Sequence, residues 1–256
     1  MWAHVVRRMA ALYDIHGNLP ALEAVLAEVE QAEVDLIVIG GDVFPGPMAA
    51  ECLDRLLACG ISIVKVRGNG ERAILECRDG RLSQKLPAAA LAAIEWHAAN
   101  LDPRHEQMLL SNTWQPTIRL GVPGTGTVLF VHATPIRDTD IFTERTPDDA
   151  LHRVFANADA DVVLCGHTHL QFERTLGDLR IVNAGSVGMP FDGPGACWAL
   201  IDGGVTLRRT PYDVEAAAET IRRSAYPGAA EFADRYILHP PTREATLEMF
   251  ASAELR

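Results

Sequence analysis

The chain has 256 residues, of which 48% are hydrophobic and 22% are charged. This length and balance are typical of one globular domain with a sizeable core, and no apolar run is long enough to cross a bilayer. The net charge of −11 opposes non-specific binding to nucleic acid, which needs a basic surface, although it still permits a nucleotide substrate. The five cysteines show no Cys-x-x-Cys spacing, so the simplest interpretation is a reduced, cytoplasmic setting.

Short apolar runs that stop abruptly at Gly, Asp, Asn or His recur along the chain. Continuous apolar runs bounded by turn residues predict strands that are buried on both faces. Helical patterns lie between and after them, and several have a capping residue or a first-turn proline, such as Asn18 and Pro20 in the first helix. The predicted strands span 10–13, 36–39, 61–66, 128–131, 162–165 and 180–182, and the predicted helices span 18–29, 48–58, 87–100, 146–155, 214–223 and 243–253.

The order of these elements predicts a mixed α/β protein whose sheets are covered by helices. We expect one domain over residues 1–256, with a helical insert at 72–115 and a helical extension at 212–256 that packs on the same domain. Residues 1–9 lack the apolar core and cleavage site of a signal peptide and are expected to form a lead-in. The Gly-rich stretch 121–126 is predicted to be a hairpin turn.

Five of the predicted strands end in residues that can bind a metal ion. Because ligands gather at the carboxyl ends of strands in α/β sheets, we expect these side chains to share one mouth. Oxygen and imidazole donors without thiolate suit Mn, Fe, Ni, Co, Zn or Mg. Seven donors are too many for one such ion and suit two, about 3.5–4 Å apart, sharing a carboxylate. The predicted ligands are Asp14, His16, Asp42, Asn69, His132, His167 and His169, with Asp42 as the natural bridge.

In order along the chain, these motifs resemble those of the calcineurin-like metallophosphoesterase superfamily. They are Asp14-Ile15-His16, Gly41-Asp42, Gly68-Asn69-Gly70-Glu71, His132 and Gly166-His167-Thr168-His169. The opening Asp-Ile-His-Gly-Asn and the later Asn183-Ala184-Gly185-Ser186-Val187 are similar to its small bacterial and archaeal phosphodiesterase-like branch. The resemblance implies a four-layer α-β-β-α sandwich, with two facing mixed sheets flanked by helices.

The resemblance also implies a hydrolase with two divalent ions, for which manganese is the first choice. Asp14, His16 and His169 would bind one ion, Asn69, His132 and His167 the other, and Asp42 both. A hydroxide held between the ions would attack a phosphodiester or a phosphomonoester, with Asp42, Asn69 and His132 as catalytic residues. The expected partner is a small phosphoester or nucleotide, with no membrane and no strong nucleic-acid binding; the family also allows a homodimer.

One departure concerns position 70, which is Gly, whereas many members have a His that contacts phosphate and protonates the leaving group. We therefore expect activated phosphodiesters to react better than alkyl monoesters, since general acid catalysis is worth about 10²–10⁴ in rate. His97 and His105 in the insert are alternative acids, although solvated surface residues are the commoner case. Tyr13 replaces a small residue and is expected to narrow the mouth or alter its ligand shell.

Other substrate contacts are harder to predict. Arg137 is a candidate phosphate ligand, and Glu71, Asn183 and Ser186 are further candidates, although the last two could simply form a tight turn. The complete ligand set favours an enzyme over the alternative, a catalytically weak scaffold that binds proteins through the same fold. A nuclease is disfavoured because the sequence lacks a basic, aromatic-rich patch.

Overall fold

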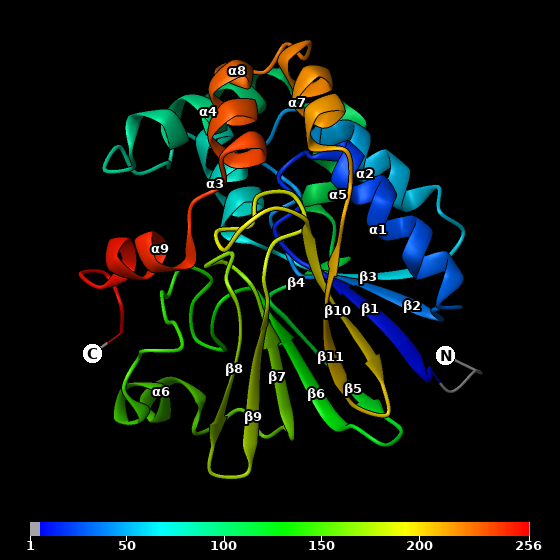
Figure 1. The fold of residues 1–256 in the computed structure, drawn as a ribbon. Coiled ribbons are helices and arrows are strands. Elements are labelled where there is room, and N and C mark those ends of the chain that lie inside the picture. Colours follow the sequence, from blue (N-terminus) through cyan, green and yellow to red (C-terminus); the bar gives the residue numbers. More distant parts are fainter. Residues whose placement is uncertain (1–5, 256) are drawn as a thin grey trace.

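Two mixed sheets face each other in the computed structural model, which describes residues 6–255 (Figure 1). The first sheet has the strand order β11-β10-β1-β2-β3-β4, and the second has the order β5-β6-β7-β9-β8. The strands of the first are β1 (Arg8–Leu12), β2 (Leu36–Ile39), β3 (Ser62–Val66), β4 (Trp114–Gln115), β10 (Ala196–Asp202) and β11 (Val205–Thr210). Those of the second are β5 (Thr117–Val122), β6 (Gly126–Val131), β7 (Val162–Cys165), β8 (Gln171–Leu176) and β9 (Leu179–Ala184).

The strands that precede the predicted ligands run parallel within each sheet. In the first sheet β1, β2, β3 and β4 are parallel, and β10 and β11 continue it antiparallel. In the second sheet β6, β7 and β9 are parallel, whereas β5 and β8 are antiparallel neighbours. The carboxyl ends of β1–β3 therefore form one row, and those of β6, β7 and β9 form a second row in the facing sheet.

Alternation of side chains along the strands explains the layers. On β1, Ala10 and Leu12 point outward into a core shared with helix α1, whereas Met9 and Ala11 point into the core between the sheets. The opposite face of the second sheet forms a further core with helices α6 and α9. Strands buried on both faces need no polar side chains, which is why the apolar runs are continuous. The predicted four-layer α-β-β-α fold is confirmed.

Helices cover the outer faces of both sheets and the edge where the ligand motifs lie (Figure 1). Asn18 caps α1 by accepting a hydrogen bond from the Ala21 amide, as predicted. The helices of the tail pack against Leu19, Met48 and Met189 near that edge. The helices are α1 (Leu19–Gln31), α2 (Ala49–Leu57), α3 (Asn69–Arg78), α4 (Ala88–Asn100), α5 (Pro103–Leu110), α6 (Asp148–Phe155), α7 (Val214–Arg222), α8 (Ala229–Phe232), the π-helix η1 (Ala233–Leu238) and α9 (Arg243–Phe250).

Two details of the secondary structure differ from the predictions. Strand β1 begins at Arg8, so the predicted lead-in of residues 1–9 is too long, and residues 1–5 lie outside the described residues. Arg8 belongs to the sheet because it is in register with Asp202 and its amide donates to the Asp35 carboxylate. In the tail, α8 and η1 lie between the two predicted helices, where no helix was predicted, since short π-helical turns have no clear sequence pattern.

Tyr13 does not narrow the mouth of the site, which corrects the expectation from the sequence. Its ring is fully buried between the sheets, and its hydroxyl donates to the Leu164 carbonyl of the facing sheet at 2.9 Å. A Cβ atom added at Gly40 or Gly166 would lie within 2.6 Å of this ring. The tyrosine therefore fills the core beneath the site, and the two glycines of neighbouring motifs make room for it.

No helix within the described part of the chain is long and apolar enough to cross a membrane. All five cysteines are free thiols, and Cys52, Cys165 and Cys197 are buried packing residues.

Candidate metal centre

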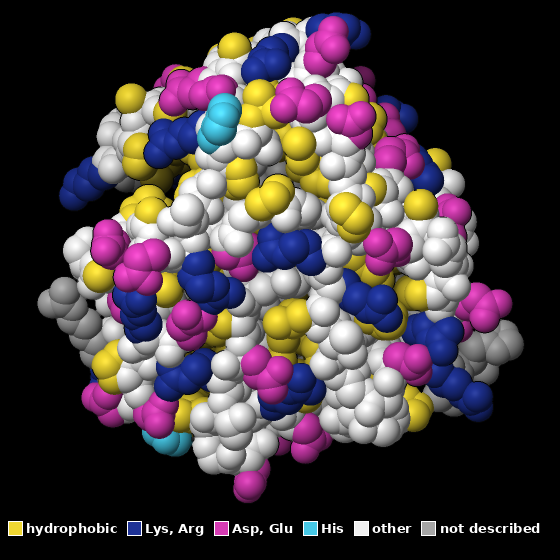
Figure 2. Space-filling model, viewed as in Figure 1, with side chains coloured by type: hydrophobic (Ala, Val, Ile, Leu, Met, Phe, Trp, Pro, Cys, Tyr) yellow, Lys and Arg dark blue, Asp and Glu magenta, His cyan; other side chains and the backbone are white. Residues whose placement is uncertain are grey.

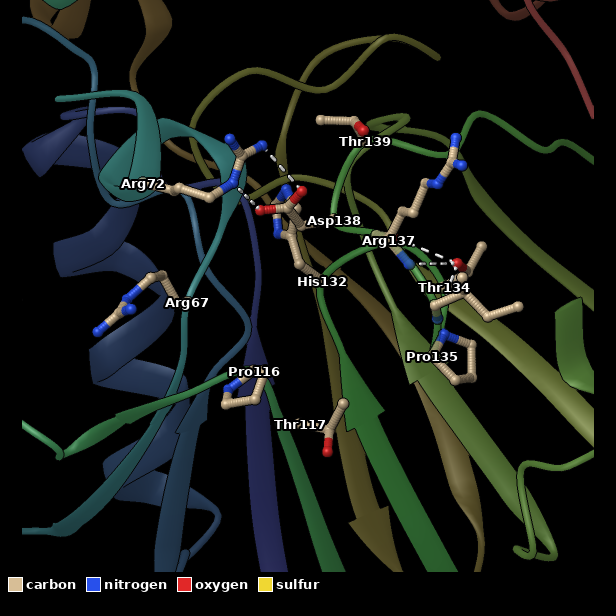
Figure 3. Close-up of a pocket in the computed structure, with 11 residues that line it drawn as sticks. Arg67, Arg72, Pro116, Thr117, His132, Thr134, Pro135, Arg137, Asp138 and Thr139 are labelled. Atoms are coloured by element: carbon tan, nitrogen blue, oxygen red, sulfur yellow. Dashed lines mark hydrogen bonds and ion pairs between the residues drawn. The ribbon is translucent and has the colours of Figure 1, made fainter. Parts of the chain in front are cut away.

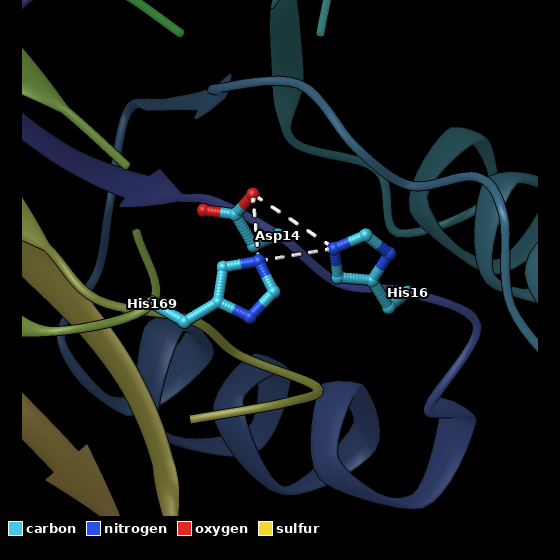
Figure 4. Close-up of side chains that lie close together, drawn as sticks. All are labelled: Asp14, His16 and His169. Atoms are coloured by element: carbon cyan, nitrogen blue, oxygen red, sulfur yellow. Dashed lines mark hydrogen bonds and ion pairs between the residues drawn. The ribbon is translucent and has the colours of Figure 1, made fainter. Parts of the chain in front are cut away.

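The structure brings all seven predicted ligands together where the two rows of strand ends meet. Figure 4 shows Asp14, His16 and His169 converging, with Asp14 Oδ1 3.4 Å from His169 Nε2 and 3.9 Å from His16 Nε2. Asp42 Oδ2 lies 3.8 Å from His16 Nε2 and 3.6 Å from His132 Nε2. Asp42 thus occupies the middle of the cluster, as expected of a shared carboxylate, and Asp14 also reaches both sides.

Five of the seven predicted ligands adopt the left-handed backbone conformation, which L-amino acids rarely enter. Outside this cluster, only Glu33 and Asp159 do so among the non-glycine residues described. Such a residue costs on the order of 1 kcal/mol or more and persists where the surrounding structure fixes it. The tight turns let Asp-x-His and His-x-His pairs reach one cavity from a single loop. The five φ angles are 52° for Asp14, 44° for His16, 55° for Asp42, 68° for His167 and 59° for His169.

Three imidazoles are oriented by backbone carbonyl groups behind them. Nδ1 of His16 lies 2.9 Å from the Pro45 oxygen, and Nδ1 of His169 lies 2.8 Å from the Met189 oxygen. His132 Nδ1 likewise lies 2.9 Å from the Gly40 oxygen. Because a carbonyl oxygen only accepts, Nδ1 carries the proton in each ring, and in the neutral ring Nε2 presents its lone pair to the cluster.

Some of the polar atoms that face the cluster lack a suitable partner unless a cation joins them. Asp14 Oδ1 is buried and accepts no hydrogen bond, while Nε2 of His16 and Nε2 of His169 lie only 3.2 Å apart. No Lys or Arg within residues 6–255 forms an ion pair with Asp14 or Asp42, although both are buried. Such a buried concentration of negative charge and lone pairs is costly unless it is neutralised, so these donors fit divalent cations.

Protonation supports this interpretation. Burial lowers the pKa of His16 to about 4 and that of His167 to about 3, so both rings are neutral and able to coordinate at pH 7. Burial also opposes a charge on His132, but Asp42 and Asp14 beside it outweigh burial and raise the pKa of His132. A proton at His132 Nε2 takes the position that a metal ion would otherwise occupy.

Asn69 can serve this cluster in two orientations. Its Oδ1 lies 3.0 Å from His132 Nε2. With the amide turned over, the NH₂ group would instead donate to His132 Nε2 at 3.0 Å and to His167 Nδ1 at 2.9 Å. The oxygen suits a bound cation and the NH₂ group suits neutral rings without one, so the same side chain fits the cluster in both states.

Glu71, a predicted substrate contact, is placed where its carboxylate binds backbone amides instead. It is completely buried, and its carboxylate accepts hydrogen bonds from the amides of Asp42 at 2.9 Å, Val43 at 2.7 Å and Phe44 at 3.1 Å. A fourth bond, from the Gly68 amide at 3.0 Å, ties the start of α3 to the same group. Glu71 therefore fixes the loops that carry Asp42 and Asn69.

Asn183 and Ser186 are also buried behind the cluster, so their predicted substrate contacts are corrected to structural ones. Asn183 donates to the Gly166 carbonyl at 2.7 Å and fixes the turn before His167. Ser186 Oγ donates to the Asp14 carbonyl at 2.6 Å and accepts from the Met189 amide at 2.7 Å. Both residues position ligand-bearing loops.

The two histidines considered as alternative acids lie away from the predicted ligands. His97 Nε2 is 3.0 Å from both the amide nitrogen and the carbonyl oxygen of Gly46, and its ring packs edge-on against Phe44. His105 is buried and pairs with Asp54 at 2.9 Å. Both histidines therefore hold the insert against the rest of the domain.

Position 70 cannot accept a side chain without a local rearrangement. A Cβ atom there would lie 2.0 Å from the Phe44 carbonyl oxygen and 2.9 Å from Asp42 Oδ1. The Gly70 amide donates to Asp42 Oδ1 at 2.7 Å, which orients the carboxylate. The absence of a His at this position is therefore built into the path of the neighbouring backbone.

Two cavities adjoin the cluster. One, of about 530 Å³, is lined by Arg67, Arg72 and Arg137 together with His132; Figure 3 shows Arg67 and Arg137 on opposite sides of it, with His132 between them. The Asp138 carboxylate binds Arg72 at 2.6 Å, whereas the exposed Arg137 side chain forms no ion pair within the described residues. The second, of about 480 Å³, contains His16, Asp42 and Asn69 in its wall. Arg67 and Arg72 were not predicted, because only the fold brings them beside His132.

Comparison with known proteins identifies the class. Residues 8–203 match the Calcineurin-like phosphoesterase superfamily domain, and the chain belongs to this family. An uncharacterized protein of Methanocaldococcus jannaschii is 26% identical over 86% of this chain and 93% of its own length. Phosphodiesterase YfcE of Escherichia coli is 26% identical over 75% of this chain and 85% of its own.

Solved structures share the fold. That of a metallophosphoesterase from Sphaerobacter thermophilus is 27% identical with a TM-score of 0.66, covering 90% of this chain and 98% of that one. A hypothetical protein from Pyrococcus horikoshii OT3 reaches a TM-score of 0.73 at 18% identity, over 92% of this chain and 99% of that one. The expected superfamily is therefore confirmed, and with it a phosphoesterase class that depends on metal.

The crowding at Gly70 predicts that Gly70→Ala lowers the free energy of unfolding by about 1–3 kcal/mol, because the Phe44 backbone must move. Urea denaturation of the metal-free protein measures this loss. Gly121→Ala is the matched control, since a Cβ atom there meets nothing within 4 Å. If the two variants were equally stable, the proposed crowding around position 70 would be contradicted.

A second prediction concerns pH. Burial lowers the pKa of His97 to about 4, from a usual value of 6.5. Above pH 6.5 the ring is neutral in the folded and the unfolded chain; between 6.5 and 4 only the unfolded chain takes up the proton, so stability falls by up to about 3 kcal/mol. His97→Gln should flatten the pH dependence of urea unfolding in this window, whereas the exposed His152→Gln should not. Parallel curves for wild type and His97→Gln would argue against a neutral, buried His97.

Proposed function

We propose that this protein is a phosphoesterase that uses two divalent metal ions, manganese being the first choice, and cleaves phosphodiesters in preference to phosphomonoesters. The observation that carries the proposal is the convergence of Nε2 of His16, His132 and His169 on two buried carboxylates that have no Lys or Arg partner within residues 6–255. Asp14, His16 and His169 would hold one ion, and Asn69, His132 and His167 the other. Asp42 would bridge them.

Bound ions would supply a water of lowered pKa as nucleophile and neutralise charge on the phosphoryl group. The protein's own part is to hold the donors in place before substrate arrives. The Gly70 amide and Glu71 fix the Asp42 loop, Ser186 fixes Asp14, and the three carbonyl contacts fix the rings. Arg137 would bind a non-bridging phosphate oxygen, since its guanidinium has no other ionic partner within the described residues and lines the cavity beside His132.

Two observations favour diesters. The Escherichia coli relative YfcE, which is 26% identical to this chain, is named a phosphodiesterase. Gly70 also leaves no side chain where many members of the family have an acid, which favours activated diesters over alkyl monoesters because their leaving groups need less protonation. Acidic and basic side chains are interspersed on the face drawn in Figure 2, and the net charge of −11 favours small substrates over nucleic acids.

The first test measures metal content by mass spectrometry and turnover of p-nitrophenyl phosphate and bis-p-nitrophenyl phosphate with added Mn²⁺. Asp42→Asn should reduce turnover at least about 100-fold and lower the metal content, because it removes the shared carboxylate. Asp159→Asn is the matched control, an exposed aspartate that also has a left-handed backbone. Wild-type protein that binds no metal and hydrolyses neither ester would favour the protein-binding scaffold.

Because residue 70 is Gly and provides no acid, we predict that kcat depends steeply on the pKa of the leaving group. Across aryl methyl phosphodiesters with chemistry rate-limiting, kcat should fall about tenfold for each unit or two of leaving-group pKa, because departing negative charge receives no proton. A flat dependence would show that another group protonates the leaving oxygen.

Arg137→Ala is expected to raise KM for bis-p-nitrophenyl phosphate roughly three- to tenfold with little change in kcat, since an exposed guanidinium contributes about 1 kcal/mol to phosphate binding. Arg153→Ala, an exposed arginine on α6, is the control and should match wild type. An unchanged KM in Arg137→Ala would remove this residue from the site.

A further inference from the structure

The second cavity, of about 480 Å³, has a different character from the arginine-lined one. It reaches the predicted ligands His16, Asp42 and Asn69 at one end, and Gly70 forms part of its floor. Most of the rest of its wall comes from two parts of the chain that carry no ligand motif, the insert and the tail, and Pro45, Thr139 and Met189 complete it. The inference below concerns the substrate of the proposed phosphoesterase and rests on that function.

The insert provides an apolar wall with little bulk. Ala89, Ala90 and Ala93 lie along one side of α4, and Ile94 continues that side inward. Leu82 and Leu86, from the segment before α4, complete this wall. Because alanine side chains are short, the wall leaves room for a ligand, and apart from Ser83 its side chains offer only carbon atoms to it.

The tail provides an aromatic wall. Tyr226, Phe232 and Tyr236 line the cavity, with ring centroids 6.2 Å apart for Tyr226–Phe232 and 5.4 Å apart for Phe232–Tyr236. Tyr236 stacks on Phe191 at 5.9 Å, and Phe191 packs on His169 at 4.5 Å. These contacts connect the wall to the metal centre. All three wall residues lie beyond residue 203, where the superfamily match ends.

The cavity offers polar groups but, within the described residues, no Lys or Arg that lacks a carboxylate partner. Arg72 lines it and pairs with Glu76 at 3.0 Å and with Asp138 at 2.6 Å. The hydroxyls of Tyr226 and Tyr236 form no hydrogen bond to another described residue and can bind the polar edge of a ligand. A charged group would lose its hydration here without a partner, whereas an uncharged ring would gain apolar contact.

We propose that this cavity binds an ester group of the substrate and that this group is a flat, uncharged aromatic ring system. The phosphate would sit at the metal centre, with its free oxygens toward Arg137, and the ring would lie between α4 and the tyrosines of the tail. The insert and the tail thereby select the substrate, while the strand-end motifs provide the hydrolytic centre.

Two non-hydrolysable phosphonates with the same headgroup test the proposal. (2-Naphthylmethyl)phosphonate should bind the manganese-loaded protein at least about tenfold more tightly than methylphosphonate in calorimetric titrations, because only the naphthyl ring buries apolar surface. Ala89→Glu places a charge on the exposed cavity wall and should reduce that ratio at least fivefold. Ala92→Glu, on the same helix but outside the cavity, should leave the ratio unchanged.

Tyr236→Ala is the second variant and should also reduce the ratio, and thermal unfolding confirms that each variant is folded. Equal affinities for the two phosphonates, or a ratio unaffected by both variants, would overturn the proposal. Protein that hydrolyses bis-p-nitrophenyl phosphate but binds neither phosphonate would overturn it while the proposed function stands. Protein that binds no manganese and hydrolyses no ester would overturn the proposed function itself.

Discussion

The centre of this protein depends on hydrogen bonds between imidazole Nδ1 atoms and backbone carbonyls. The carbonyls of Gly40, Pro45 and Met189 fix three rings and direct their Nε2 atoms toward two buried carboxylates. Each carbonyl belongs to a loop that is itself held, as Ser186 holds Met189 and Glu71 holds the residues before Pro45. Loops that follow strands of both sheets therefore brace one another through the atoms that orient the predicted ligands.

This arrangement works against the stability of the metal-free chain. Five left-handed residues and two carboxylates with no Lys or Arg partner among the described residues are held in a space that largely excludes water. The layers on either side, with continuous apolar strands and Tyr13 joining the sheets, offset that cost. Cations that bind only the folded chain would add to its stability by mass action, so the free energies of folding and metal binding are coupled.

The remaining parts of the chain shape the surroundings of the centre. Gly70 keeps the Asp42 loop close to α3 and thereby excludes a side chain at that position. On one side three arginines approach His132, and Asp138 neutralises one of them. On the other side the small residues of α4 and the rings of the tail enclose an apolar cavity. The cavity on one side of the centre is thus basic and the cavity on the other side is apolar. This difference can place the charged phosphate and the apolar ester group of a substrate on different sides.

Apolar patterns and strand ends in the sequence predicted six of the eleven described strands, the helix cap at Asn18 and the seven residues that meet at the strand ends, whereas the family resemblance carried by the ordered motifs implied the layered fold. These are local signals, since a buried strand must be apolar and a helix cap acts within a few residues. The sequence alone did not distinguish the roles of Glu71, Asn183 and Ser186. Each binds backbone groups that are distant in the sequence and come close only when the chain folds. It also could not show that Tyr13 points into the core, or that Tyr226 and Tyr236 line the cavity that reaches the predicted ligands. Such contacts depend on how segments far apart in the chain pack, and that packing is decided by the tertiary structure.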